Sequence, residues 1–131
     1  VDSKEELYST CDFISLHIPG NDETVNSIDF ELLSKMKEGA ALINTARKEV
    51  IDEEGLKKMF SERPDFCYGS DLTPDCKEDI CTIFGDRAFF TAKKMGAQTA
   101  EANINSGVAA VTQIIDFFEK GDETFRVNKK A

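Results

Sequence analysis

Long apolar runs are missing from this sequence, as are tryptophan and all but three prolines. No stretch approaches the ~20 consecutive apolar residues that a helix needs to cross a bilayer. The first residues, Val1 to Glu5, have neither the basic start nor the apolar core of a secretory signal. The sequence therefore predicts a protein with no membrane partner.

Positive charge is also scarce. Sixteen Lys and Arg stand against 25 Asp and Glu, which gives a formal net charge of −9. Nucleic acids and anionic membranes are held by clustered Lys and Arg, so neither is expected as a partner. An anionic substrate would have to be bound by a local basic pocket.

The four cysteines show no CxxC spacing, and the chain has one histidine. A metal site is therefore not expected, and the scattered cysteines favour a reducing, cytoplasmic compartment. Cys67 lies in a strand-like run and is expected to be a small core residue. Cys76 and Cys81 are expected to lie in a loop, where they form only a weak redox candidate.

Strand-like and helix-like segments alternate through the first part of the chain. With 131 residues, 40% of them hydrophobic and 31% charged, the sequence fits one compact globular unit. Ser3, Asp29 and Asp52 each stand where a helix N-cap is expected. This alternation predicts an α/β fold, a partial Rossmann-like, doubly wound parallel sheet covered by helices on both faces. The expected strands are Phe13–Ile18, Ala41–Ile43, Phe66–Ser70 and Ala88–Thr91.

Polar or charged residues follow each of these strands. In open α/β sheets, ligands bind just outside the carboxyl ends of the strands, so the clusters predict one shared site. Its centre is Asn44-Thr45-Ala46-Arg47, and the other clusters are Pro19-Gly20, Asp71 and Lys93-Lys94. An enzyme is the expected class of protein.

The last third of the chain predicts one long helix. Thr99 is a plausible N-cap, apolar residues then recur every three or four positions, and Gly121 marks the end. Beyond it, only Thr124–Val127 could form a strand. We expect residues 1–97 to be the C-terminal half of a nucleotide-binding domain, and residues 98–131 a helix and tail that return to a second domain.

A GxGxxG turn, which binds the pyrophosphate of a dinucleotide, is absent, because no two glycines are separated by a single residue. Either the protein binds no dinucleotide, or these residues are the back half of a longer chain. The start at Val1 without methionine favours the second alternative.

Ordered motifs between Phe13 and Ala97 resemble the D-2-hydroxyacid dehydrogenases. Some further residues are most similar to short D-3-phosphoglycerate dehydrogenases, which oxidise 3-phosphoglycerate to 3-phosphohydroxypyruvate with NAD in serine synthesis. The family motifs are Phe13-Ile14-Ser15-Leu16-His17-Ile18-Pro19, Met36 to Arg47 and Gly69-Ser70-Asp71, and the further ones are Lys48-Glu49-Val50, Lys93 to Glu101 and Phe125 to Lys129.

The resemblance implies that Arg47 binds the carboxylate and carbonyl of the substrate, a role that suits its planar fork of donors. His17, the single histidine, is expected to be structural. The implied cofactor is NAD, and the residues implied to bind it are Ile18, Pro19, Thr45, Ala46, Arg47, Asp71, Lys94 and Gly96. Asp71 would accept from the carboxamide, although a turn or capping role is an alternative.

The sequence departs from the family at the proton carrier. Most members have a histidine shortly before the glycine equivalent to Gly96, whereas this chain has Lys93 and Lys94. Counting back from Gly96 puts Lys94 in the place of the histidine, and counting forward from Thr91 puts Lys93 there. Lys94 is the preferred proton carrier, because Gly96 is the more constrained anchor for the alignment.

A second departure is Cys76, which stands where the family has a glutamate that pairs with the histidine. A carboxylate beside a lysine would favour its charged form, whereas a base must lose its proton, so the two departures are consistent. Asp75 or Glu78 could still take the place of the glutamate.

Three functions are compatible with these features. The leading hypothesis is an NAD-dependent phosphoglycerate dehydrogenase that acts on a small phosphorylated 2-hydroxy acid as a homodimer. The alternatives are a glyoxylate or hydroxypyruvate reductase and a dehydrogenase-like protein that has lost catalysis and serves in NAD binding or association.

Overall fold

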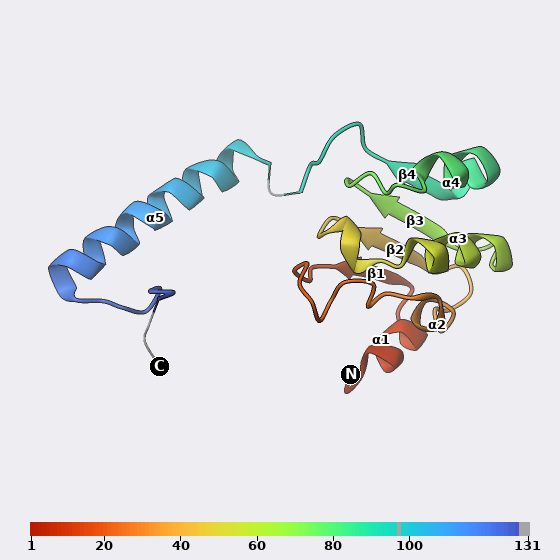
Figure 1. Cartoon of the computed structure of the whole chain (residues 1–131), viewed down its shortest axis with the longest axis horizontal. Coiled ribbons are helices and arrows are strands. Elements are labelled where there is room, and N and C mark those ends of the chain that lie inside the picture. Colours follow the sequence, from red (N-terminus) through yellow and green to blue (C-terminus); the bar gives the residue numbers. More distant parts are fainter. Residues whose placement is uncertain (97, 129–131) are drawn as a thin grey trace. The chain divides into compact units, whose positions relative to one another are not determined.

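A computed structural model describes residues 1–96 and 98–128, and residues 1–96 form the first of two compact units. Its centre is a parallel sheet with the strand order β1-β2-β3-β4 (Figure 1). The expected α/β class and parallel sheet are confirmed. The strands are β1 (Phe13–Leu16), β2 (Ala41–Asn44), β3 (Cys67–Ser70) and β4 (Ala88–Phe90).

Short helices connect the strands, and three of them begin at the expected caps. The side chains of Ser3, Asp29 and Asp52 accept backbone N–H groups in the first turns of α1, α2 and α3. The helices are α1 (Lys4–Thr10), α2 (Phe30–Leu33), α3 (Glu53–Glu62) and α4 (Lys77–Phe84), with 3-10 turns η1 (Lys48–Val50) and η2 (Gly85–Arg87).

The apolar core lies between the helices and one face of the sheet. Register places Ile14, Leu42 and Tyr68 side by side on this face, and all three are buried. Leu33, Leu56 and other helix residues with almost no exposure pack in the same cluster. This side of the sheet is closed, as expected.

Within residues 1–96, no helix covers the opposite face of the sheet, which differs from the expectation of helices on both sides. Phe13 is 75% exposed and Phe89 69% exposed. Cys67 is exposed as well, so its expected place in the core is wrong. Side chains alternate across a strand, and Cys67 falls on the uncovered face while its neighbour Tyr68 falls on the closed one.

Helix α4 corrects another expectation. The segment that contains Cys81 was expected to be a loop, but Cys81 lies within α4, and Ile80 of the same helix is fully buried. The cysteines behave differently, because Cys76 is buried and Cys81 is exposed. Burial, followed by the charge of Glu53, raises the pKa of Cys76 to about 12, so its thiol is unreactive at neutral pH.

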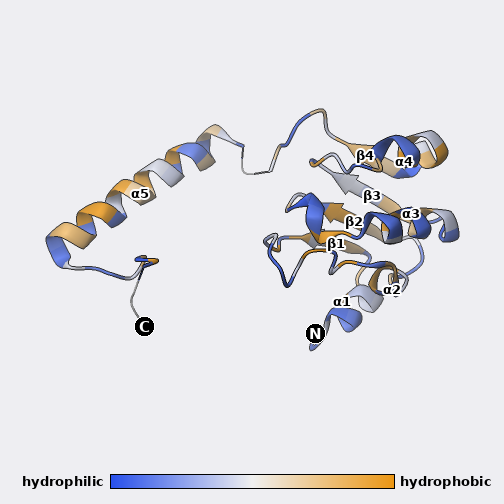
Figure 2. Ribbon diagram, in the orientation of Figure 1, coloured by the Kyte–Doolittle hydropathy of each residue, from blue (hydrophilic) through white to orange (hydrophobic). Residues whose placement is uncertain are grey.

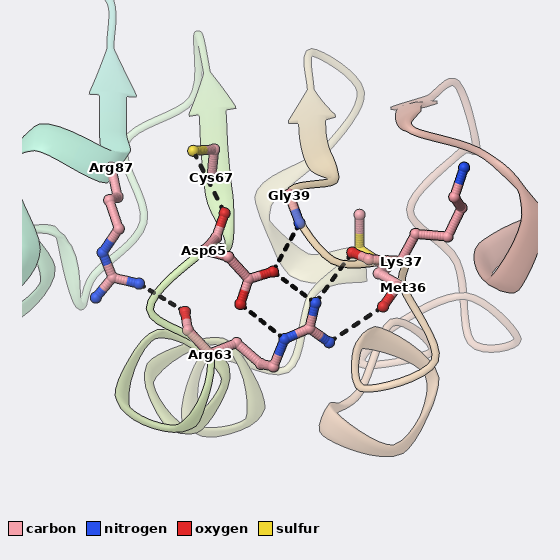
Figure 3. Close-up of polar contacts among 7 residues, drawn as sticks. All are labelled: Met36, Lys37, Gly39, Arg63, Asp65, Cys67 and Arg87. Carbon is pink, nitrogen blue, oxygen red and sulfur yellow. Dashed lines mark hydrogen bonds and ion pairs between the residues drawn. The ribbon is translucent and has the colours of Figure 1, made fainter.

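At the amino ends of β2 and β3, one arginine joins three backbone segments (Figure 3). Arg63 binds both carboxylate oxygens of Asp65, and its guanidinium also donates to the carbonyls of Met36 and Lys37. Asp65 in turn accepts the N–H of Gly39. These bonds fix the amino ends of β2 and β3, which lie at the opposite end of the sheet from the predicted site.

The second unit contains α5 (Ala100–Lys120), which begins and ends as expected. Thr99 caps the first turn, and Gly121 takes the left-handed conformation at φ 68°. Figure 2 shows apolar and polar residues alternating along its ribbon. Thr124 and Phe125 form a turn instead of the strand that was considered. Among the described residues, no helix combines the length and apolarity needed to cross a membrane.

Candidate active site

The loop after β2 is held in shape by a buried asparagine. Asn44 is 1% exposed, its Oδ1 accepts the N–H of Ala46 at 3.0 Å, and its Nδ2 donates to the carbonyl of Arg47 at 2.9 Å. These bonds fix the backbone from Thr45 to Arg47 at the carboxyl end of the sheet. The loop is thus preorganised, with its main-chain groups held by the strand from which it emerges.

Arg47 itself is exposed, and its Nη1 donates to the carbonyl of Ala46 at 2.8 Å. The remaining guanidinium donors have no partner among the described residues, and five donors in a planar fork suit a carboxylate. The structure therefore places a cation with free donors at the carboxyl end of β2.

Asp71 follows β3 and is 5% exposed. Its Oδ2 accepts the N–H of Met95, 2.8 Å away, and the N–H of Gly96. Its Oδ1 is buried and has no hydrogen-bond partner within residues 1–96 and 98–128. A buried polar atom without a partner is rare and costly, so Oδ1 is a candidate for receiving a donor from a ligand.

The loop after β4 carries both candidate lysines. The hydroxyl of Thr91 donates to the carbonyl of Lys93 at 2.6 Å, and the bonds to Asp71 follow directly after Lys94. Lys93 and Lys94 are both exposed. The structure thus brings both lysines to the carboxyl end of the sheet and leaves the choice between them as a prediction.

A hollow of about 460 Å³ lies between these three loops. Its lining is mainly apolar, with Ile43, Phe89 and Met95, and it includes three predicted cofactor-binding residues, Thr45, Asp71 and Gly96. Apolar hollows with a few polar groups that converge are typical of small-molecule sites.

The end of β1 contributes less to this hollow. Ile18 packs against the core, while Pro19 is exposed and its carbonyl accepts the hydroxyl of Thr24 at 2.5 Å. Neither residue lines the hollow. His17, which follows β1, is exposed, and its Nε2 lies 2.9 Å from the hydroxyl of Ser15 in the strand.

The two carboxylates that could replace the family glutamate lie near the start of α4. Asp75 is paired with Lys48, and Glu78 is exposed on the helix. Glu53 accepts the N–H groups of Asp75 and Cys76 at 2.9 and 2.8 Å. Among these groups, only Glu78 has no contact that occupies its carboxylate in the described part of the chain.

The hollow fits the nicotinamide end of the implied cofactor. A nicotinamide ring is flat and largely apolar, and its carboxamide has N–H donors that match the free Oδ1 of Asp71. Nothing in the chain matches the glycine-rich turn for the pyrophosphate. The residues present can therefore hold one end of a dinucleotide.

The roles of two residues that shape the site were not predicted from the sequence, although Asn44 belongs to the predicted centre of the site and Ser70 to a family motif. Asn44 fixes the Arg47 loop, and Ser70 ties the ends of β2 and β3 together because its hydroxyl donates to the carbonyl of Asn44 at 2.7 Å. The signal was available, since a polar residue at a buried strand position needs a partner nearby.

Comparison with known proteins identifies the family and the fold of the chain. Residues 1–79 match the family model of the D-isomer specific 2-hydroxyacid dehydrogenase, NAD binding domain. The chain is similar to the NAD-bound 3-phosphoglycerate dehydrogenase of Entamoeba histolytica, with 46% identity and a TM-score of 0.88 over 100% of this chain and 43% of that one. NAD as the cofactor of the family is thereby confirmed.

Curated relatives carry more than one activity in their names. A D-3-phosphoglycerate dehydrogenase of Haemophilus influenzae is 31% identical over 98% of this chain and 32% of its own length. A hydroxypyruvate reductase of Thermotoga maritima is 33% identical over 84% of this chain and 37% of its own. The chain thus spans about a third of these relatives, and it belongs to the D-isomer-specific 2-hydroxyacid dehydrogenases, as part of their NAD-binding domain.

Proposed function

We propose that the protein oxidises D-3-phosphoglycerate to 3-phosphohydroxypyruvate with NAD. The observation that carries the proposal is Asp71, which lines a mainly apolar hollow at the carboxyl end of the sheet and whose buried Oδ1 has no hydrogen-bond partner among the described residues. Hydride transfer requires a binding site for the nicotinamide, a cation that binds the anionic substrate, and a proton carrier. The loops after β2, β3 and β4 together offer all three.

Arg47 binds the substrate carboxylate and donates to the reacting oxygen, which favours the carbonyl as it forms. Lys94 in its neutral form takes the proton of the hydroxyl, and it returns that proton during reduction. NAD, when bound, accepts the hydride from the substrate carbon.

The cofactor is held at its nicotinamide end by this chain. Asp71 accepts from the carboxamide, the main chain of Thr45 and Ala46 contacts the ring, and Ile18 and Pro19 bound the apolar slot. Gly96 has no side chain, so the loop that carries Lys93 and Lys94, the lysine loop, can lie close to the nicotinamide site. We assign residues 1–97 to the C-terminal half of the NAD-binding domain, and the uncovered face of the sheet is consistent with further chain packing there.

The boundary proposed between the two parts falls on Ala97, which lies outside the described residues. Residues 98–131 form the helix and tail that return to the substrate-binding domain. In the complete protein we infer a homodimer located in the cytoplasm. Its preference for a phosphorylated substrate is supported by the similarity to the 3-phosphoglycerate dehydrogenases.

A second candidate activity is reduction of hydroxypyruvate or glyoxylate. It is favoured by the similarity to the Thermotoga maritima hydroxypyruvate reductase. Both reactions need the same seat for the nicotinamide, and they differ in the phosphate of the substrate.

Steady-state kinetics of the complete enzyme separate the candidates. We expect kcat/KM for D-3-phosphoglycerate oxidation to exceed that for D-glycerate at least a hundredfold. A higher value for the unphosphorylated substrate assigns the second activity. Absence of turnover with either substrate, in protein that binds NAD, would instead assign a binding protein without catalysis.

A further inference from the structure

Asp71 joins two loops of the site through one carboxylate group. Its Oδ2 is committed to the backbone N–H groups of Met95 and Gly96. Its Oδ1 is buried but has no partner in the described part of the chain. The two oxygens of one side chain are therefore available for different tasks, because Oδ2 is bonded within the protein and Oδ1 is still unpaired.

The bonds to Oδ2 fix the backbone directly after Lys94. Two successive N–H groups bound to one charged acceptor restrict the dihedral angles of Met95 and Gly96, since bonds to ionised groups are stronger than those between neutral groups. The side chain of Lys94 is exposed and can turn, but the chain from which it projects is anchored.

Close packing at Gly96 supports the same anchor. A Cβ atom built on this glycine would lie 3.0 Å from Oδ2 of Asp71 and 3.2 Å from the carbonyl oxygen of Thr45. The lysine loop thus rests directly on the residues that follow β2 and β3. A larger residue would have to push it away from both.

We propose that Asp71 is a positioning residue for Lys94 and couples cofactor binding to the order of the lysine loop. Oδ2 anchors the loop, and Oδ1 receives the carboxamide N–H of the nicotinamide. The second half rests on the proposed function, whereas the anchoring half depends only on contacts within residues 1–96. Because coupling between two sites is reciprocal, cofactor binding also strengthens the anchor.

Tryptic cleavage tests the anchor directly, because trypsin cuts after lysine and the N–H of the Lys94–Met95 peptide bond is one of the two bound by Asp71. The rate of cleavage at Lys94–Met95 in the complete enzyme, which is expected to bind NAD, is measured by mass spectrometry, with Lys58–Met59 in α3 as the internal reference. We expect Asp71→Ala to raise the Lys94–Met95 rate at least tenfold relative to the reference. NAD should slow this cleavage in the wild type and have no effect in the variant.

Asp71→Asn separates the two oxygens. Its amide oxygen can still accept both N–H groups, so cleavage should stay within threefold of the wild type. Its amide nitrogen then stands where Oδ1 was and opposes the carboxamide donor, so the Kd for NAD should rise at least tenfold. Asp75→Asn, which changes an exposed carboxylate in the same segment, should alter neither measurement.

Gly96→Ala tests the anchor with Asp71 intact, and it should also raise cleavage at Lys94–Met95. If Asp71→Ala unfolds the whole protein, which faster cleavage at Lys58–Met59 in α3 would reveal, the Gly96→Ala variant provides the test of the anchor. Wild-type cleavage at Lys94–Met95 in folded Asp71→Ala, or in Gly96→Ala, overturns the anchor. Unchanged NAD affinity in Asp71→Asn overturns the coupling, and if the wild type itself binds no NAD, the proposed function fails while the tryptic result still stands.

Discussion

Lys48 donates a hydrogen bond to Asp75, with Nζ and Oδ1 2.9 Å apart, and thereby links η1 to the segment before α4. The hydrogen bond to Asp75, followed by the charge of that carboxylate, raises the pKa of Lys48. The pair also occupies one of the two carboxylates that could take the place of the family glutamate. Asp75 is therefore paired with Lys48, and no hydrogen bond or ion pair joins it to Lys93 or Lys94 in the described part of the chain.

We predict that Asp75→Asn changes kcat of the complete enzyme by less than about threefold, because its carboxylate is paired with Lys48 and does not serve the proton carrier. Steady-state assays of alcohol oxidation at several pH values provide the measurement. Glu78→Gln is the matched comparison, since this carboxylate is exposed on α4. A tenfold loss in either variant would assign that carboxylate to proton transfer.

We predict that Arg47→Lys lowers kcat/KM of the complete enzyme by a factor of a hundred or more, roughly 3 kcal/mol of transition-state stabilisation. One ammonium group cannot reproduce two parallel hydrogen bonds to a carboxylate and a reacting oxygen. Lys48→Arg is the control, because it alters the neighbouring cation without touching the proposed substrate contact. A loss under threefold in Arg47→Lys would contradict the assignment of Arg47.

We predict that the 131-residue chain alone does not bind NAD with micromolar affinity. It offers Asp71 and an apolar hollow to the nicotinamide but no glycine-rich turn to the pyrophosphate, and that turn contributes much of the binding of a dinucleotide. Isothermal titration of the chain with NAD is the measurement. A micromolar Kd would contradict the assignment of these residues to half of a binding domain.

Asp65 and Arg63 support a prediction about stability. The hydrogen bonds from Arg63, and then from the N–H of Gly39, hold the pKa of Asp65 well below the usual value of 3.8. A carboxylate with a lowered pKa stabilises the fold above its unfolded pKa, and this contribution is lost as the pH falls through the folded value. The contribution of these hydrogen bonds to the free energy of unfolding should therefore be complete at neutral pH and decline below about pH 4, where the carboxylate of the unfolded chain begins to take up protons.

We expect Asp65→Asn to lower the free energy of unfolding by about 1–2 kcal/mol at pH 7. The difference from the wild type should shrink as the pH falls from about 4 toward 2, because the carboxylate is then increasingly protonated in the unfolded chain while it stays charged in the folded one. Urea unfolding followed by circular dichroism measures it. Asp86→Asn, a change at an exposed carboxylate, is the control, and a pH-independent difference would contradict the ionic origin.

Local signals made most of the fold predictable. Asp29, Asp52 and Thr99 cap helices as expected because a short side chain acceptor at a helix start satisfies free N–H groups whatever the tertiary context. Period-two burial in β1 followed directly from Ile14 and Leu16. Helix α4 was missed because its N-cap residue, Cys76, makes no side-chain capping hydrogen bond and the first residues of the helix are charged.

The position of Cys67 and the partners of Asp71 could not be predicted in the same way. Whether the face with Cys67 is covered depends on other segments, and a strand alone does not specify it. Asp71 bonds to amides 24 and 25 residues away, whereas the turn and capping roles considered from the sequence are local. The location of the site can therefore be predicted from the polar clusters at the strand ends. The contacts between the loops can be identified only once the fold is known.

The last prediction concerns the proton carrier. If Lys94 takes the alcohol proton, it must be neutral for oxidation and charged for carbonyl reduction. The rates of the two directions should then have opposite slopes over the same pH range, with oxidation rising where reduction falls. We expect Lys94→Ala to remove this dependence and to lower kcat more than it changes KM.

Lys93→Ala is the matched control, because both lysines are exposed on the same loop and only Lys94 directly precedes the amides bound by Asp71. We expect Lys93→Ala to keep the pH dependence and mainly to raise KM, since it removes a local positive charge from a site for an anion. The reverse pattern would assign the proton to Lys93 and shift the alignment from Gly96 by one residue. If both variants keep the wild-type profile, the proton passes through another group, for which His17 and a water molecule bound to Asp75 are the next candidates to test by substitution.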